Sequence, residues 1–322
     1  MKHKLLWLLL LMLVIVISLY IGWDFPALSP YVQAARLTKL WGYLLIAVLV
    51  VPSTIVFQTV IHSRYLSPGI LGIDAVYVLI QSMYYFAGVR LFKELTPHSL
   101  VGYMVQMGCL LLFFVLTLRL VKIDWRLQQQ ETLWLMTGMI LSSVLRQLST
   151  FFQILMDPNE YLTLQRRLFP SFQGLSQSLL VTATFVAILG LGYFYHKRFV
   201  LDVYHLGREM ALSLGVDIVR QSPRLLSVVV LMVGTATALV GPLLFFGFMI
   251  TNITYTICVS HQHTQRIVIG ILVGSIFVVS GQWLIERVFN NQYTLNLLIE
   301  GVGGLLFFIL LWRKAGDVFV NH

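Results

Sequence analysis

Charged residues are scarce in this chain of 322 residues. Asp, Glu, Lys and Arg make up 11% of it and apolar residues make up 58%, whereas a soluble domain carries about 25% charged residues. The chain also lacks the Gly-x-x-x-x-Gly-Lys-Ser/Thr phosphate loop of an ATPase. It offers no Ser/Lys pair or paired aspartates on spans that would face each other. These absences exclude a soluble domain, and they predict a membrane protein that does not itself hydrolyse ATP or act as an intramembrane enzyme.

Disulfide and metal-binding patterns are missing as well. The two cysteines, Cys109 and Cys258, both fall inside apolar stretches, where a lone cysteine is usually a small hydrophobic residue. His261 and His263 lie two residues apart on a basic loop without a nearby carboxylate, and Cys258 falls within the preceding apolar stretch, which makes a poor metal site. We therefore expect no disulfide, no metal centre and no cofactor, and we expect His261–His263 to be a solvated loop.

Long apolar runs are what the sequence has in abundance. About 20 residues at a rise of ~1.5 Å each cross the ~30 Å hydrocarbon core of a bilayer, and backbone in lipid must satisfy its own hydrogen bonds, as a helix does. The first run reaches Trp23, beyond the length of a signal-peptide core, so we expect it to remain as a helix. The sequence predicts an all-α polytopic membrane protein with about ten spans, at 5–23, 40–60, 70–89, 99–118, 132–156, 174–194, 224–240, 241–258, 267–285 and 296–312.

The basic residues orient these spans. If the N-terminus is cytoplasmic, most of the 22 Lys and Arg residues fall in cytoplasmic loops, and Arg36, Lys39 and Arg287 are among the few on the outer side. The positive-inside rule therefore predicts that both termini are cytoplasmic. The formal charge of +9 thus indicates topology rather than nucleic-acid binding.

Polar side chains crowd one predicted span. Ser142, Arg146, Thr150 and Gln153 recur at spacings of three and four residues, which places them on one face of a helix. A charge inside a span costs about 2.5–3.5 kcal/mol on the insertion scale, so it normally faces protein or water. Two interpretations stay open, a polar wall of a translocation pathway and a hydrogen-bonded clamp between helices.

The longest cytoplasmic connection, about 196–223, contains a second feature. Met210, Ala211 and Leu214 recur at helical spacing, and Gly215 stands where the helix should stop. The pattern predicts a short helix over Leu206–Val216. It suits either a helix lying on the lipid headgroups or a docking element for a cytoplasmic partner.

Several strings resemble one family of permeases. Arg36–Lys39, then Gln58 and then Leu66–Gly72 follow the early signature of the FecCD family, permeases of importers for iron–siderophores, haem and cobalamin, without a gap in spacing. Later strings continue the resemblance in the same order: Leu206–Val216, Gly241–Phe248 and Gly301–Phe308.

The departures from the family pattern indicate a divergent branch. Thr38 and Lys39 replace a proline and an arginine, and Ser63-Arg64 replaces Asn-Pro. Thr251-Asn252 replaces Pro-His, and Gln282 replaces Asp. The string Met156–Glu160 is similar to the branch that serves catecholate-type siderophores.

The resemblance implies one transmembrane permease domain over 1–322 with a type II ABC importer fold in a bacterial inner membrane. It implies four kinds of partner: a cytoplasmic ATP-binding subunit, a second permease chain, identical or homologous, a substrate-binding protein on the outer face, and the ferric siderophore. Docking of the binding protein would use Arg36, Lys39 and Arg287, which otherwise are ordinary interfacial bases. Gln58 joins the pathway candidates. The residues implied in ATPase coupling are Leu206, Gly207, Glu209, Ala211, Leu214 and Gly215.

Other transport classes stay open. The chelate could be haem or cobalamin, or the chain could be a metal-ion ABC permease of the same topology. A proton-coupled secondary transporter needs carboxylates within spans, and Asp74 is nearly the only candidate.

Overall fold

The computed structural model describes residues 2–22, 30–88, 100–121, 128–172, 175–258, 260, 262–290 and 292–320. These residues form helices and turns, and none of them lies in a strand. Most of the predicted spans coincide with a long helix. The helices found at the predicted positions are α1 (Lys2–Gly22), α2 (Pro30–Val60), α3 (Ile73–Met83), α5 (Leu100–Val121), α6 (Gln128–Ile154), α8 (Gln177–His196), α11 (Ile218–Val240), α12 (Phe246–Ile257), α13 (His263–Arg287) and α14 (Leu295–Val320). Of the described helices, six are long and apolar enough to cross a membrane by themselves, namely α1, α2, α5, α8, α11 and α13.

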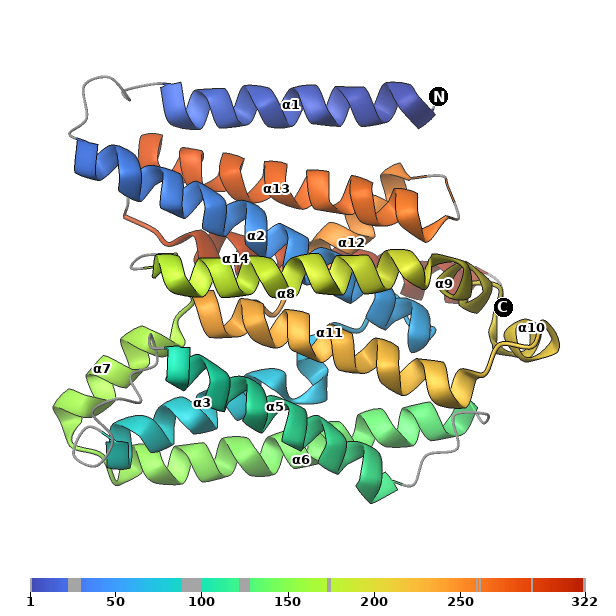
Figure 1. The fold of residues 1–322 in the computed structure, drawn as a ribbon, viewed down its shortest axis with the longest axis horizontal. Coiled ribbons are helices and arrows are strands. Elements are labelled where there is room, and N and C mark those ends of the chain that lie inside the picture. Colours follow the sequence, from blue (N-terminus) through green and yellow to red (C-terminus); the bar gives the residue numbers. More distant parts are fainter. Residues whose placement is uncertain are drawn as a thin grey trace.

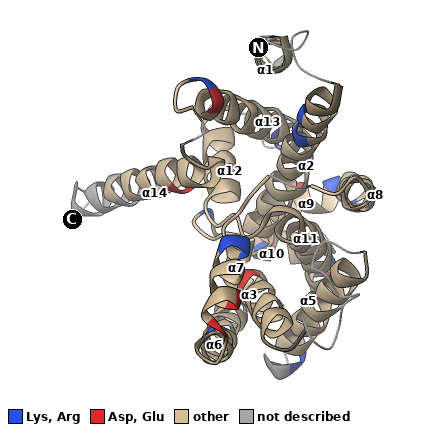
Figure 2. Ribbon diagram, turned by 90° about the vertical axis from the view of Figure 1, so that its left-hand side faces the viewer, with Lys and Arg blue, Asp and Glu red and all other residues tan. Residues whose placement is uncertain are grey.

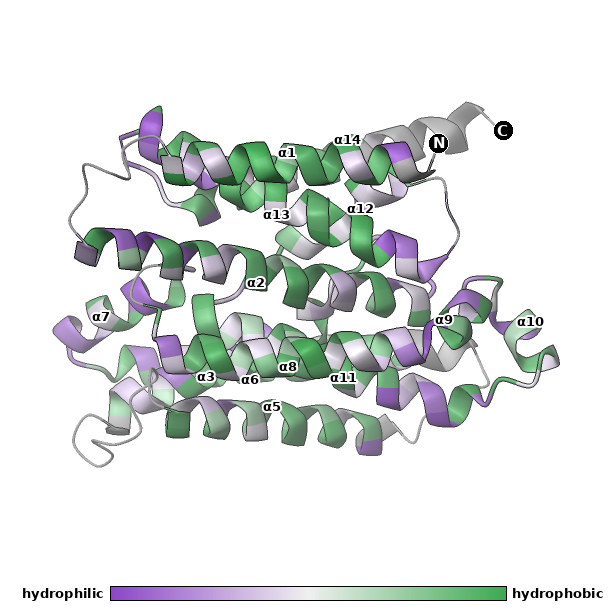
Figure 3. Ribbon diagram, turned by 45° about the horizontal axis from the view of Figure 1, so that its top comes forward, coloured by the Kyte–Doolittle hydropathy of each residue, from purple (hydrophilic) through white to green (hydrophobic). Residues whose placement is uncertain are grey.

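The long helices run side by side along one axis, with shorter elements at the two ends (Figure 1). One end carries α7 (Pro158–Leu168), and the other carries α9 (Arg198–Tyr204) and α10 (Arg208–Ser213) together with the first turn of α1. We call these the α7 end and the α10 end. Apolar residues dominate the middle of the helices and hydrophilic residues gather toward their ends (Figure 3). This distribution is that of a bundle spanning an apolar layer.

Local sequence explains the end helix α7, which the apolar runs did not predict. Asp157 caps it by accepting a hydrogen bond from the Asn159 backbone N–H at 2.9 Å, and Pro158 occupies the first turn. Arg166 and Arg167 lie in its last turn, where they complement the helix dipole.

α2 lies at the centre of the bundle. Almost every residue from Leu40 to Val60 is buried, and α2 packs against α8, α11, α12 and α13. α13 approaches it closely through two glycines, since a Cβ on Gly270 or Gly274 would meet the side chain of Val51. This small-xxx-small spacing is typical of tightly packed helices in membranes. By contrast, α1 packs mainly on α13, contacts α2 through Tyr20, whose ring centroid lies 6.0 Å from that of Tyr43, and, like α14, lies at the periphery when viewed from the α7 end (Figure 2).

Two helices are interrupted in the interior. A 3₁₀ turn, η2 (Pro68–Leu71), precedes α3, and a π-helical turn, η3 (Tyr84–Gly88), follows it. The predicted eighth span was expected to begin at residue 241, but a turn over 241–245 separates α11 from α12, which begins at Phe246. Gly241, with φ of 101°, makes that turn. The turn η2 and the turn over 241–245 both line a cavity of about 20 Å³ beside the buried carboxyl of Asp74, so their irregular backbone is enclosed by protein.

Gly72 makes the break before α3 possible. Its φ is 92°, and a Cβ there would meet the hydroxyl of Ser142 on α6 and the ring of Phe113 on α5. We predict that Gly72→Ala destabilises the protein by at least about 1–2 kcal/mol, the cost of a left-handed backbone for an L-residue, seen as a lower Tm in detergent. Gly108→Ala is the matched control, because a Cβ at Gly108 has no heavy atom within 4 Å. Equal Tm values for the two variants would contradict this packing.

Candidate functional site

At the α7 end, an ion pair fastens α2 to α13. Arg36 donates from Nη2 to Oε2 of Glu286 at 3.2 Å, and the two side chains are 15% and 16% exposed. Gln282 donates to the other oxygen of Glu286 at 2.8 Å. The Arg36 guanidinium also lies over the ring of Tyr20, 5.3 Å from its centroid, which brings α1 into the contact.

The three basic residues predicted for docking therefore differ in their surroundings. Arg36 is already paired within the chain. Lys39 is partly buried and lines a cavity of about 110 Å³ with Tyr293 and Thr294. Arg287 is partly buried and follows Glu286 directly at the end of α13. The sequence had no signal for the Arg36–Glu286 pair, because 250 positions separate the two residues.

We predict that the charge pair stabilises the bundle. Arg36→Glu would place two carboxylates together and lower the Tm. The loss should be about 1–3 kcal/mol, below the ~3–5 kcal/mol of a fully buried pair. The exchanged variant R36E/E286R should recover much of the Tm, since it restores opposite charges across the same helices. The ion pair would be unimportant if the double variant were no more stable than Arg36→Glu alone.

α6 carries the polar face predicted for a pathway, but its members separate into two groups. Arg146, Gln147 and Thr150 are exposed on the surface of the bundle. Ser142, in contrast, is buried and donates to the Gly138 carbonyl at 2.6 Å, and Gln153 donates from Nε2 to the Ser82 hydroxyl at 2.9 Å. The four residues share one face of α6, but this face is not uniformly accessible, because Ser142 is buried and Gln153 contacts α3 whereas Arg146 and Thr150 are exposed.

The exposed part of this face has an electrostatic consequence. In the described part of the chain no carboxylate lies within ion-pair distance of Arg146, although the buried carboxyl of Asp74 is near enough to interact with it electrostatically. An arginine in a membrane-spanning helix faces protein or water rather than lipid. This surface of α6 consequently requires either a second polypeptide or an aqueous path beside it.

Gln58, the remaining pathway candidate, has a local structural role. It is buried at the end of α2, and its Nε2 donates to the carbonyls of Arg64 and Leu66 at 3.0 and 3.2 Å. These contacts close the turn that leads from α2 into η2. Its Oε1 has no hydrogen-bond partner among the described residues.

The predicted helix in the 196–223 segment is present and is shorter than expected. It is α10, Arg208–Ser213, flanked by Gly207 with φ of 102° and Gly215 with φ of 78°. Ala211 is fully buried against the rest of the chain. Leu206, Met210 and Leu214 are each at least 60% exposed. We call these three residues the coupling patch, and the segment presents it beyond the α10 end of the bundle (Figure 1).

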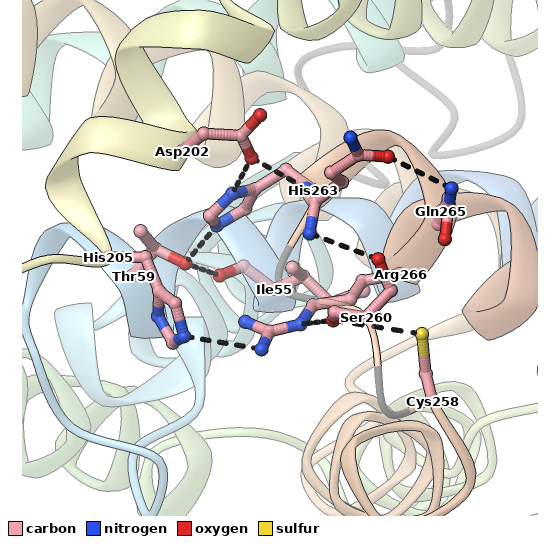
Figure 4. Close-up of polar contacts among 10 residues, drawn as sticks. Ile55, Thr59, Asp202, His205, Cys258, Ser260, His263, Gln265 and Arg266 are labelled. Carbon is pink, nitrogen blue, oxygen red and sulfur yellow. Dashed lines mark hydrogen bonds and ion pairs between the residues drawn. The ribbon is translucent and has the colours of Figure 1, made fainter.

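Sequence reasoning missed a polar joint just before α10 (Figure 4). Asp202 on α9 accepts hydrogen bonds from the backbone N–H and the ring Nδ1 of His263, at 2.7 and 2.8 Å. The other ring nitrogen of His263 lies 2.9 Å from the hydroxyl of Thr59 on α2. The joint therefore links α2, α9 and α13.

The expectation of a solvated loop is thus wrong for His263, whose side chain is fully buried, while His261 lies outside the described residues. No group of three metal-ligating side chains occurs in the part of the chain that is described. In the sequence, the joint is represented only by one polar residue near the end of each of three elements. Nothing in the sequence indicates that these residues meet.

A bundle of long apolar helices with hydrophilic residues gathered toward its ends defines a multi-pass membrane protein. Residues 5–313 match the FecCD transport family. The chain belongs to that family, as the order of its motifs predicted.

Curated relatives extend over nearly the whole chain. The petrobactin import system permease protein YclO of Bacillus subtilis (strain 168) is 30% identical over 304 residues, which cover 94% of this chain and 94% of that protein. The petrobactin import system permease protein FatC of Bacillus anthracis is 27% identical over 296 residues, 90% of this chain and 81% of that protein.

Solved structures share the fold. An ABC transporter assigned to the metal-chelate type, in an inward-facing conformation, superposes with a TM-score of 0.81 at 20% identity, over 97% of this chain and 100% of that one. PsaBC from Streptococcus pneumoniae, solved with a Fab, gives a TM-score of 0.61 at 13% identity, over 85% of this chain and 90% of that one. The all-α permease architecture predicted from the sequence is confirmed.

Proposed function

We propose that this chain is the permease subunit of an ATP-driven importer that carries a ferric siderophore, of catecholate type, across a bacterial inner membrane. The observation that carries the proposal is the match along 94% of both chains to a permease of petrobactin import. In the proposed topology the α10 end and both termini face the cytoplasm, because the basic residues concentrate there.

In this proposal the exposed polar face of α6 lines the pathway opposite a second permease chain. Arg146 would then meet water and an anionic chelate instead of lipid, which removes the cost of a charge in hydrocarbon. The permease moves between outward-open and inward-open states by rigid-body tilting of helices. In this movement α2 and α13 act as one unit, because polar contacts join them at both ends and their middle parts pack closely.

A separate ATPase contacts the coupling patch in this proposal, together with Gly207, Glu209 and Gly215, which shape the segment. Ala211 supports the segment from inside the permease. On the outer face, Lys39 and Arg287 meet acidic residues of the binding protein, and Arg36, which is paired with Glu286, adds its positive charge beside them. Exposed ion pairs contribute only about 0.2–1 kcal/mol each, so these bases chiefly steer and orient the partner.

Lys39→Glu should weaken capture of the binding protein at moderate salt without lowering the Tm, and unchanged capture would remove Lys39 from the docking surface.

Uptake of radiolabelled substrate tests the function. Cells whose only importer of this family contains this chain and its partner subunits are offered iron bound to a catecholate siderophore or to a hydroxamate siderophore, and separately haem and cobalamin. We expect accumulation of the catecholate complex alone. Preference for another chelate would replace the substrate class, and accumulation of free metal ion only would make the chain a metal-ion permease.

The coupling patch yields a specific prediction. Met210→Asp with Leu214→Asp would place charges in an apolar contact, and an unpaired buried charge is strongly unfavourable. The ATPase should no longer co-purify with the permease, and substrate-stimulated ATP hydrolysis should fall to background. The pair Met210→Leu with Leu214→Met keeps the apolar surface and should behave as wild type. Full ATPase capture by the Asp variant would leave α10 as a membrane-surface element.

The assignment of the exposed face of α6 to the pathway yields another prediction. Arg146→Gln should reduce uptake of the anionic iron chelate by tenfold or more, equivalent to about 1.4 kcal/mol, with an unchanged Tm because the side chain is exposed. Arg146→Lys keeps the charge and should retain more uptake. Gln153→Ala, which breaks the bond to Ser82, should instead lower the Tm. Normal uptake by Arg146→Gln would exclude this face from the pathway.

A further inference from the structure

A third cavity, of about 180 Å³, lies at the α10 end beside the polar joint. It is bounded by the end of α2 and the turn that follows, the end of α9, and residues of α12 and α13. Its lining residues are Gln58, Thr59, His62, Arg64, Tyr204, His205, Tyr255 and Arg266. One enclosed water needs roughly 15 Å³, so the cavity has room for a polyatomic ligand.

The lining is rich in positive charge. It includes two arginines and two histidines, and no Asp or Glu. The guanidinium groups of Arg64 and Arg266 lie 5.3 and 5.4 Å from the ring centroid of the same residue, Tyr255, so both cations gather around one ring. Arg266 is only 6% exposed. Arg64 is exposed at the cavity mouth, so the buried guanidinium of Arg266 bears most of the cost of two like charges placed near each other.

Among the described residues, Asp202 is the carboxylate whose charge acts on Arg266. It belongs to the adjoining joint, and it is already engaged by the backbone and ring of His263 (Figure 4). Arg266 donates from Nε to the Ser260 carbonyl at 2.9 Å and lies 3.2 Å from His205 Nε2, which fixes the guanidinium at the cavity wall. The wall is therefore a built, cationic surface rather than a mobile rim.

Gln58 limits the kind of ligand that the cavity can bind. Its amide nitrogen is committed to two carbonyls, and its buried Oε1 has no partner among the described residues. A ligand that fits must offer acceptor oxygens to the guanidinium groups and can offer one hydroxyl to this oxygen. Hydrogen phosphate carries both kinds of atom, and so does a phosphodiester headgroup that bears a glycerol hydroxyl; arginine is well suited to phosphate oxygens.

We propose that this cavity binds a phosphate group, supplied either as free phosphate or as the headgroup of an anionic phospholipid. The proposal does not depend on the identity of the transported substrate. A bound phosphate would neutralise the paired arginines and connect α2, α9, α12 and α13. Those contacts lie directly before α10, so occupancy would also brace the segment that carries the coupling patch.

Thermal stability of the full-length permease, purified with its partner subunits in dodecyl maltoside, tests the site. In one arm inorganic phosphate is titrated against chloride at equal ionic strength. In the other, phosphatidylglycerol or phosphatidylcholine is added to the micelles in phosphate-free buffer. We expect the Tm of wild type to rise by several degrees in at least one arm, as for any ligand that binds the folded state. A rise with phosphate identifies a free anion, and a rise with phosphatidylglycerol alone identifies a lipid headgroup.

Arg64→Gln should remove most of that rise, and it should fold because Arg64 is exposed at the cavity mouth. Arg220→Gln is the matched control, since Arg220 lies at the same end, is 76% exposed and does not line the cavity. This variant should keep the full rise. The proposal is overturned if neither arm raises the Tm of wild type, or if Arg64→Gln and Arg220→Gln respond equally.

Discussion

The antiparallel contact between α2 and α13 is the interaction on which the rest of the structure depends. At the α7 end it is closed by Arg36 and Glu286. At the α10 end it is closed by Thr59 and His263, with Asp202 held to the same histidine. Polar contacts thus join the two apolar helices at both ends, where water is near, and side-chain packing holds the middle of the pair together.

Packing in the middle of the pair depends on small residues. A Cβ on Gly274 would lie 3.4 Å from the Cβ of Ala47, so the two helices are close enough for their backbones to set the spacing. Helices in lipid gain little from the hydrophobic effect, and close packing and hydrogen bonds hold them together instead. Several elements attach to this pair directly: α1 rests on α13, α8, α11 and α12 pack against α2, and α9 is held by Asp202; α3 and α5 join the bundle through α11.

The sequence was sufficient for what depends on local composition. Apolar runs of about 20 residues located the long helices, and Gly215 correctly marked the end of the short helix that finishes at Ser213. It also identified the family through the order of short motifs, a property of the whole chain that no single string carries.

What the sequence could not supply depends on which surfaces meet. Periodicity placed Ser142 and Gln153 with Arg146 on α6, but α3 packs over the first two and leaves the third exposed. Ala211 and Leu214 looked equivalent on α10, yet only Leu214 is available to a partner. His263 looked solvated because its partners are distant in sequence. Each of these differences is a tertiary contact.

The account rests on α2 and α13 moving as one unit in an importer driven by ATP, and a cross-link tests this most directly. The variant A47C/G274C, with Cys109 and Cys258 replaced, brings two Cβ atoms to about the 3.5–4.5 Å that a disulfide needs. The measurement is ATP-dependent uptake of a ferric siderophore by the assembled transporter in proteoliposomes, before and after oxidation. The account predicts equal uptake in the oxidised and reduced states. Uptake that is lost on oxidation and recovered on reduction would show that the two helices must separate, and would contradict it.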